Sequence, residues 1–277
     1  MLSYRHAFHA GNFADVHKHS AWLLGIHALL RKPSPFCLLD AYAGAGAYAL
    51  DDPAARKTGE WESGIGRLEA AGEMPDVLAT YRDAVRAFND NEPLQRYPGS
   101  PALAARELRE QDRLVCLELH PTDFPLLKRR FASDFRVHVH HRDAREGLPA
   151  LLPPPEKRGL VLIDPAYEQA AEYADVPKAV HSALARWPSG SYLLWYPLLS
   201  GKLHVSMLRS LAEGVRTLLV QELLLFPEAP GLQGSGLAWI NPPWQADVSL
   251  REAGDWLCGN LGASGARASL DWRAVSE

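Results

Sequence analysis

The feature that most constrains the fold is an alternation of short apolar runs with longer segments of helical periodicity. The apolar runs are rich in Val, Leu and Ile, as is typical of strands that are covered on both faces. Most of the segments between them carry apolar residues at helical spacing. This alternation predicts an α/β fold, with an open parallel sheet and helices on both of its faces. The predicted strands are 36–40, 113–118, 135–139, 159–163, 191–196, 217–225 and 236–240.

The predicted helices lie between these strands, and two of them carry sequence signals for their first turn. One follows Asn12, whose side chain can cap a helix, and it places Val16 and Ile26 on one apolar side. Another has Pro101 at its first helical position, with Ser100 as the predicted capping residue. The predicted helices are 14–31, 101–111, 121–132, 144–152, 170–186, 200–213 and 248–260.

Residues 50–97 break the alternation. They show no strand pattern, whereas Pro75-Asp76 opens a stretch with apolar residues at helical spacing. We therefore predict two parts: a sheet domain formed by residues 1–49 and 98–277, and a small helical insertion formed by residues 50–97. A chain of 277 residues is long enough for one large α/β domain with such an insertion.

Composition and charge exclude several classes of protein. No apolar run approaches the roughly 20 residues of a membrane helix, and the N-terminus lacks the apolar core of a signal peptide. The odd number of cysteines argues against a disulfide framework, so we expect a cytoplasmic protein. The net charge of −4 counts against a nonspecific nucleic-acid binder, which is usually basic. Local basic groups such as Arg56-Lys57 and Lys128-Arg129-Arg130 are expected to be solvated.

A glycine-containing loop directly follows the first predicted strand, in Asp40-Ala-Tyr-Ala-Gly44-Ala-Gly46. Glycines let a backbone turn tightly and approach a ligand closely, although many ordinary turns need them too. The third glycine of the dinucleotide fingerprint would fall at Ala49, so the NAD-binding pattern is incomplete. The acidic Asp40 would repel a pyrophosphate but suits a positively charged sulfonium ligand. The loop therefore favours S-adenosylmethionine over NAD as the cofactor.

Acidic residues follow the next two predicted strands. Glu118 ends the second strand, where an acid usually bonds ribose hydroxyls about 20 residues after the glycine loop. It lies 72 residues after Gly46 (118 − 46), and removing the 48 residues of the insertion leaves 24. Asp143 follows the third strand, where it can accept a hydrogen bond from the adenine amino group of a cofactor. Without this context, both residues could be exposed loop acids.

The fourth predicted strand leads into Asp164-Pro165-Ala166-Tyr167, beside the first strand at the point of a doubly wound sheet where ligands bind. These residue types suit methylation of an exocyclic amine. The lone pair of adenine N6 is delocalised into the ring, and hydrogen bonds from N6 to the Asp164 carboxylate and the Pro165 carbonyl would favour a pyramidal nitrogen. Tyr167 would stack on the extruded base. Because Asp-Pro is also a common turn pair, the motif gains its weight from the other sites.

A second proline motif and the histidines offer alternatives. Asn241-Pro-Pro-Trp244 matches the amino-methyltransferase signature better, but it follows the last predicted strand, away from the expected cofactor site, and we interpret it as a structural turn. The histidines have no acid or cysteine partners at a recognisable zinc spacing, so we predict no metal site and expect them to face solvent or substrate. They form two groups, His6, His9, His17 and His19, and His138, His140 and His141.

Several motifs together point to one family. They are Leu2-Ser-Tyr-Arg-His, His9-Ala-Gly-Asn, Ala14-Asp-Val, Lys18-His19, Asp40 with Ala43-Gly-Ala-Gly46, Tyr97-Pro-Gly-Ser-Pro101, Glu118-Leu-His-Pro121, Leu162-Ile-Asp-Pro165 with Tyr167-Glu168, Trp195-Tyr-Pro197 and Asn241-Pro-Pro-Trp244. Through them, essentially the whole chain resembles the RlmJ family of bacterial 23S ribosomal RNA adenine-N6 methyltransferases. The resemblance implies a Rossmann-like, class I S-adenosylmethionine-dependent methyltransferase sheet with a small helical insertion.

The resemblance also implies roles for single residues. Asp164 corresponds to the catalytic residue of the family, and Tyr4 and Lys18 to residues near the substrate and the active site. Together with Pro165 and Tyr167, they form the predicted substrate site. Cofactor contacts are implied at His19, Tyr42, Ser100, Glu118, Asp143, Ala144 and Asp164.

Three positions depart from the residues that are usual in the family. Tyr42 replaces histidine and Ala144 replaces glycine at implied cofactor contacts, and a backbone contact could survive at the latter. Ala166 replaces a second proline, which would hold residue 165 extended. Alanine relaxes that restraint and adds an N–H group, so we expect a less preorganised motif.

The motifs and the resemblance together predict methylation of adenine N6 in 23S ribosomal RNA, of the adenine 2030 type, with S-adenosylmethionine as cofactor. The expected substrate is protein-free or partly assembled RNA, because a base in flexible RNA costs less to extrude. We expect a monomer that acts away from membranes. The alternatives are a DNA adenine-N6 methyltransferase, since the amino-group chemistry is shared, an NAD-dependent dehydrogenase, and a non-catalytic RNA-binding Rossmann protein. The incomplete glycine fingerprint argues against the dehydrogenase, and the acidic net charge argues against the binding module.

Overall fold

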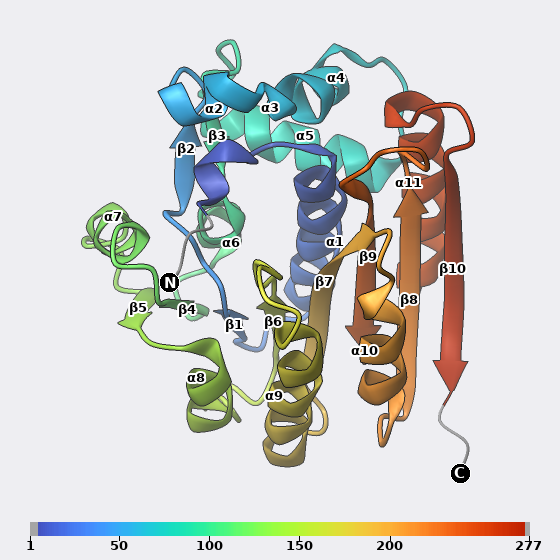
Figure 1. Ribbon diagram of the computed structural model, residues 1–277. Helices are drawn as coiled ribbons and strands as arrows, with labels where there is room; N and C mark the ends of the chain where they lie inside the picture. Colours follow the sequence, from blue (N-terminus) through green and yellow to red (C-terminus); the bar gives the residue numbers. More distant parts are fainter. Residues whose placement is uncertain (1–4, 275–277) are drawn as a thin grey trace.

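A central eight-stranded sheet organises the computed structural model, which describes residues 5–274 (Figure 1). The strand order is β10-β8-β9-β7-β6-β1-β4-β5. A separate pair of short strands is antiparallel. The strands of the large sheet are β1 (Cys37–Asp40), β4 (Arg113–Glu118), β5 (Val137–His141), β6 (Gly159–Ile163), β7 (Ser191–Leu199), β8 (Thr217–Leu224), β9 (Leu232–Ile240) and β10 (Arg267–Ala274), and those of the pair are β2 (Ala47–Ala49) and β3 (Arg96–Pro98).

The five strands from β7 to β5 run parallel, so their carboxyl ends share one edge of the sheet. β1 lies between β6 and β4, at the point where the strand order reverses and where doubly wound sheets bind ligands. The predicted Rossmann-like α/β class is confirmed. The expectation that all strands are parallel is wrong for the far end, where β9 and β10 run antiparallel to their neighbours. The connection 225–231 is too short for a crossover helix, so β9 returns beside β8 as in a hairpin.

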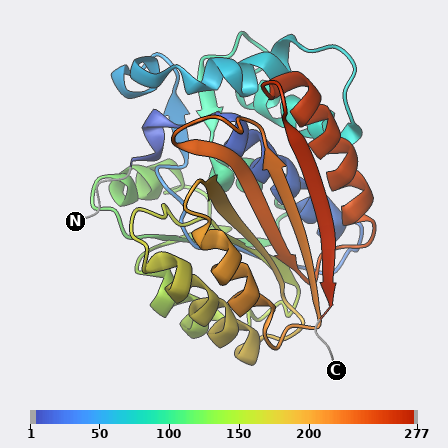
Figure 2. The same cartoon turned by 45° about the vertical axis from the view of Figure 1, so that its right-hand side comes forward.

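Helices cover both faces of this sheet, and each face has its own hydrophobic cluster. α1, α6 and α11 lie on one face, α8, α9 and α10 on the other, and α7 packs against β5 (Figures 1 and 2). Figure 2 shows α11 beside β10 at the outer edge of the sheet. The helices are η1 (His6–Phe8), α1 (Phe13–Leu30), α6 (Ser100–Glu107), α7 (Asp123–Arg130), α8 (Ala144–Leu151), α9 (Glu172–Arg186), α10 (Leu203–Ala212) and α11 (Ala246–Leu261).

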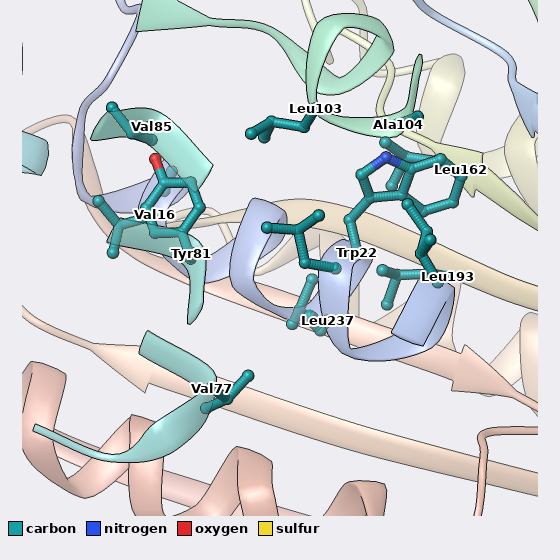
Figure 3. Packing of buried hydrophobic residues seen from close by; sticks show 14 of the residues in the cluster. Val16, Trp22, Val77, Tyr81, Val85, Leu103, Ala104, Leu162, Leu193 and Leu237 are labelled. Atoms are coloured by element: carbon teal, nitrogen blue, oxygen red, sulfur yellow. The ribbon is translucent and has the colours of Figure 1, made fainter. Parts of the chain in front are cut away.

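Helix α1 begins where its cap predicts, because the Asn12 side chain accepts hydrogen bonds from the N–H groups of Ala14 and Asp15, both at 3.0 Å. The prediction of a single apolar side is wrong. The sheet covers one side of α1, while α5 (Asp76–Phe88) and α11 cover the other, so even Lys18 is buried. Figure 3 shows Trp22 of this helix beside Leu162 of the sheet.

Residues 53–88 form four helices that lie above the amino end of α1 (Figure 1). They are α2 (Pro53–Thr58), α3 (Glu60–Ser63), α4 (Ile65–Ala70) and α5. The strandless pattern predicted for 50–97 misses β3, which pairs with β2 and closes this segment. We propose the division into a sheet domain and an insertion with the boundaries given above. Within residues 5–274, no helix is long and apolar enough to cross a membrane.

Candidate active site

Two neighbouring cavities open at the carboxyl edge of the parallel strands. The larger, of about 240 Å³, lies over the loop that follows β1 and the ends of β4 and β5. The smaller, of about 180 Å³, lies between the start of α1 and β7. His6, Lys18, Asp164 and Ala166 line both cavities. The two cavities therefore meet at the residue that the sequence predicts to be catalytic.

Glu118, at the end of β4, holds the loop that follows β1. Its carboxylate accepts hydrogen bonds from the N–H groups of Gly44, at 2.7 Å, and His120, at 2.5 Å. Burial raises the pKa of this carboxyl group. Gly44 has a φ of +61°, and a Cβ atom there would lie 2.3 Å from the Tyr48 hydroxyl, so the loop requires glycine. Both Gly44 and Glu118 line the larger cavity.

Two residues predicted to contact the cofactor line neither cavity. Gly46 has a φ of +82°, and a Cβ atom there would approach Leu127 of α7 at 2.9 Å. Asp40 is fully buried, and burial raises its pKa to about 7. Its Oδ1 atom accepts a hydrogen bond from the Tyr42 N–H group at 3.3 Å. Both residues belong to the loop but do not line the cavity, and a direct cofactor contact by either stays a prediction.

Asp143 lies at the end of the larger cavity that β5 and α8 form. It caps α8 by accepting a hydrogen bond from the Arg145 N–H group at 2.8 Å. The Arg145 guanidinium, 2.6 Å away, lowers the pKa of Asp143. Ala144 and Tyr42 line the same part of the cavity. The fold thus brings these three residues together at one cavity, and their contacts to a cofactor stay predictions.

His19 and Ser100 line the larger cavity on the side of α1 and α6. The His19 ring is stacked on Tyr97 and shares a hydrogen bond of 2.7 Å with the Tyr97 hydroxyl. Burial holds the pKa of His19 well below its ordinary value, so the ring is neutral. Ser100 is the first residue of α6 and not its cap as predicted, because the extended residue before the helix is Gly99.

A buried group of charges joins α1 to the end of β6. Lys18 donates to Asp164 Oδ2, and its Nζ atom lies 2.8 Å from Asp15 Oδ1. Asp15 also accepts hydrogen bonds from the Gly11 N–H group at 2.8 Å and pairs with His6 at 2.9 Å. Burial opposes these charges, but the two carboxylates hold the pKa of Lys18 above its ordinary value, and His6 and Lys18 hold that of Asp15 well below. The ammonium ion therefore stays charged beside Asp164.

Asp15 is a site residue that the sequence reasoning missed. The available signal was its position three residues before Lys18, which places both side chains on one side of a helix.

The rest of the Asp164 motif belongs to the smaller cavity. Tyr167 lines it together with Trp195, and has a φ of +52°, which is uncommon outside glycine. The Tyr167 hydroxyl donates to the Trp195 carbonyl at 3.2 Å, and its ring lies 4.5 Å from that of Tyr173. Pro165 lines neither cavity. Tyr4, predicted to lie near the substrate, falls outside the described residues.

Asn241 lies at the opposite edge of the sheet. β9 runs antiparallel to β7, so Ile240 pairs with Tyr192 near the amino end of β7. The Asn241 amide donates to the carbonyls of Pro188, at 3.0 Å, and Gly190, at 2.7 Å. These contacts support its interpretation as a structural turn.

The expectation that the histidines face solvent or substrate is wrong for His17. This residue is completely buried, and its ring forms hydrogen bonds inside the core with Ser235, at 2.8 Å, and Gln221, at 3.0 Å. Over residues 5–274, no group of three or more histidine, cysteine or acidic side chains is arranged to hold a metal ion.

Comparison with known proteins decides the family. Residues 33–274 match the family model described as "Ribosomal RNA large subunit methyltransferase D, RlmJ". This chain belongs to the RlmJ family.

Relatives of the RlmJ family match nearly the whole chain. "Ribosomal RNA large subunit methyltransferase J" of Escherichia coli (strain K12) is 42% identical over 276 residues, which cover 98% of this chain and 99% of that protein. The protein of the same name from Haemophilus influenzae is 39% identical, with 98% and 99% covered. The crystal structure of protein LPL1258 from Legionella pneumophila has a TM-score of 0.88 and 34% identity, with 97% and 99% covered.

Membership of the RlmJ family makes this chain a methyltransferase. The resemblance and the enzyme class predicted from the motifs are confirmed. The dehydrogenase and the non-catalytic binding module are therefore excluded.

Proposed function

We propose that this protein transfers a methyl group from S-adenosylmethionine to the N6 amine of an adenine in 23S ribosomal RNA. The observation that carries the proposal is the meeting of the two cavities at Asp164. In this proposal the larger cavity holds the cofactor, and the smaller cavity receives the adenine.

The side chains around the larger cavity fit this cofactor. Glu118 uses one lone pair of each oxygen for a backbone N–H group, and its other lone pairs can accept ribose hydroxyls. Asp143 can accept a hydrogen bond from an adenine amino group. When bound, S-adenosylmethionine supplies a methyl group on a positively charged sulfur. The carboxylates of Glu118, Asp143 and Asp164 favour such a cation over a phosphate.

Asp164 would orient the target amine. Lys18 holds one oxygen of its carboxylate and is itself held by Asp15, so the second oxygen can accept one N6 hydrogen in a set direction. The motif predicts the Pro165 carbonyl as the acceptor of the other hydrogen, although Pro165 lines neither cavity. An amine held in this way would become pyramidal and direct its lone pair at the methyl group of a bound donor, and water would take the proton that the methylated amine loses. The acceleration comes from positioning and electrostatics.

The names of the two relatives support ribosomal RNA rather than DNA as the substrate, since each is called a ribosomal RNA large subunit methyltransferase. We propose that a monomer acts in the cytoplasm on protein-free or partly assembled 23S RNA. An adenine extruded from flexible RNA would enter the smaller cavity, where Tyr167 and Trp195 offer aromatic rings.

Transfer of radiolabelled methyl groups to purified nucleic acids tests the proposal. Transcribed 23S RNA, 16S RNA and double-stranded DNA are offered separately, and the label is mapped by nuclease digestion. We expect N6-methyladenine in 23S RNA alone. Label in DNA without label in 23S RNA would establish the DNA enzyme instead, and label on another atom would refute the proposed chemistry.

A further inference from the structure

Trp195 forms part of the wall of the smaller cavity and is held from behind by a chain of hydrogen bonds. Its indole Nε1 atom donates to Ser235 Oγ at 2.9 Å. Ser235 Oγ lies 2.8 Å from His17 Nδ1, and His17 Nε2 lies 3.0 Å from Gln221 Oε1. Ser235, His17 and Gln221 are each at most 1% exposed. A buried polar chain from α1, β8 and β9 thus ends on a cavity residue of β7.

Each hydrogen bond in the series from Gln221 to Trp195 has one consistent direction. Gln221 donates through its amide nitrogen to the Leu250 carbonyl at 2.5 Å, so its Oε1 atom accepts from His17 Nε2. The neutral His17 ring then accepts at Nδ1, and the Ser235 hydroxyl is the donor. This leaves Ser235 Oγ as the acceptor for the indole N–H group. Burial lowers the pKa of His17 to about 4, which agrees with a neutral ring.

We propose that Ser235, oriented by His17, is a positioning residue that fixes the Trp195 indole at the wall of the smaller cavity. The inference rests on the proposed function, in which this cavity receives the adenine. Trp195 also lies beside Lys18, whose Nζ atom is 5.9 Å from the centroid of the indole and donates to Asp164. An indole that turned would both reshape the cavity and disturb Lys18.

The test compares two serines that each accept an indole N–H group. Ser235→Ala removes the bond to Trp195, whereas Ser191→Ala removes a bond of 2.8 Å from Trp239, at the opposite edge of the sheet. Rates of single-turnover methyl transfer are measured at saturating cofactor and 23S RNA, well below both melting temperatures. We expect Ser235→Ala to lower the rate about 10-fold, with unchanged cofactor affinity, because small misplacements near a reacting group are costly. Ser191→Ala should lower the melting temperature alone.

A double-mutant cycle separates positioning from general damage. Trp195→Phe has no N–H group to lose, so adding Ser235→Ala to it should lower the rate by less than twofold further. Equal rates in Ser235→Ala and the unaltered protein, equal losses in the two serine variants, or losses that multiply in the cycle would each overturn the inference. If Ser235→Ala does not fold, Ser235→Cys replaces it, with a smaller expected loss.

A spectroscopic measurement keeps this inference separate from the proposed function. In protein labelled with 5-fluorotryptophan, the ¹⁹F signal of Trp195 is the one that Trp195→Phe removes. Ser235→Ala should shift or broaden this signal and Ser191→Ala should not. An unaltered Trp195 signal refutes the positioning role, whereas unaltered protein that transfers no methyl group to 23S RNA refutes the proposed function alone.

Discussion

Replacing Asp164 by asparagine tests the proposed active site more sharply than removing its side chain. The two side chains have nearly the same shape, but asparagine carries only one acceptor oxygen. Lys18 donates to Asp164 Oδ2, and Asp15, with its Oδ1 atom 2.8 Å from the ammonium group, keeps it in place. The oxygen of an asparagine would therefore face Lys18, and its NH₂ group would face the N6 amine, donor against donor.

The expected loss is large for both Asp164→Asn and Asp164→Ala. From the motif alone, asparagine should retain more activity than alanine because it keeps a carbonyl oxygen. The contact with Lys18 removes that advantage. Loss of one preorganised hydrogen bond at a reacting centre costs about 10²–10³-fold in rate, or about 3–4 kcal/mol. Folding should change little, since Lys18 keeps Asp15 as its counter-charge.

Single-turnover rates at saturating cofactor, read beside melting curves, measure these losses. Asn241→Ala is the control, because Asn241 lies at the opposite edge of the sheet and bonds only backbone carbonyls there. It should lower the melting temperature and leave the rate unchanged. Near-normal transfer by Asp164→Asn, or transfer abolished by Asn241→Ala in a folded protein, would refute the reasoning.

Four further outcomes follow from the structure. Burial lowers the pKa of His17 to about 4 in the folded protein, against about 6.5 in the unfolded chain. The free energy of unfolding is therefore highest above pH 6.5 and falls as the pH drops toward 4, because the unfolded chain takes up a proton there that the folded protein does not. Urea unfolding should therefore show that His17→Leu loses about 2 kcal/mol less stability than the unaltered protein between pH 8 and pH 5; equal pH dependence would contradict this. Gly44→Ala should weaken binding of S-adenosylmethionine about 10-fold in calorimetric titration, because the added Cβ displaces the loop, and unchanged affinity would count against the cavity assignment. A chelator should leave methyl transfer unchanged, unless purified protein holds stoichiometric zinc whose removal stops it. Protein-free 23S RNA should be methylated faster than mature large subunits, and the reverse order would disprove the proposed substrate form.

The parallel half of the fold could be predicted because β1, β4, β6 and β7 are short apolar runs separated by segments of helical periodicity. Strand β10 was not predicted because it is an edge strand, in which exposed Arg267, Ser269 and Asp271 alternate with Ala268 and Leu270. The antiparallel direction of β9 was not predicted, because an apolar run has the same pattern in either orientation. Only the short connection 225–231 carried that information.

The candidate site could be predicted where its residues follow strand ends, as Glu118, Asp143 and Asp164 do. Its supporting residues could not, because their partners are distant in the chain. His17 and Ser235 are separated by 218 residues, and nothing in the surrounding sequence links them. Without that contact, a histidine on a helix is equally well explained as exposed.

Consecutive residues of α1 serve three separate purposes. His17 bonds Ser235 in the core, Lys18 bonds Asp164, and His19 bonds Tyr97 beside the larger cavity. Neighbouring residues in a helix point about 100° apart, so rotating α1 by a single step would misdirect all three side chains together. Gly25 fixes the approach of this helix to the sheet, because a Cβ atom there would come within 2.4 Å of Leu160. One residue inserted between Asn12 and His17 would thus break the helical register that both cavities share, without altering any strand.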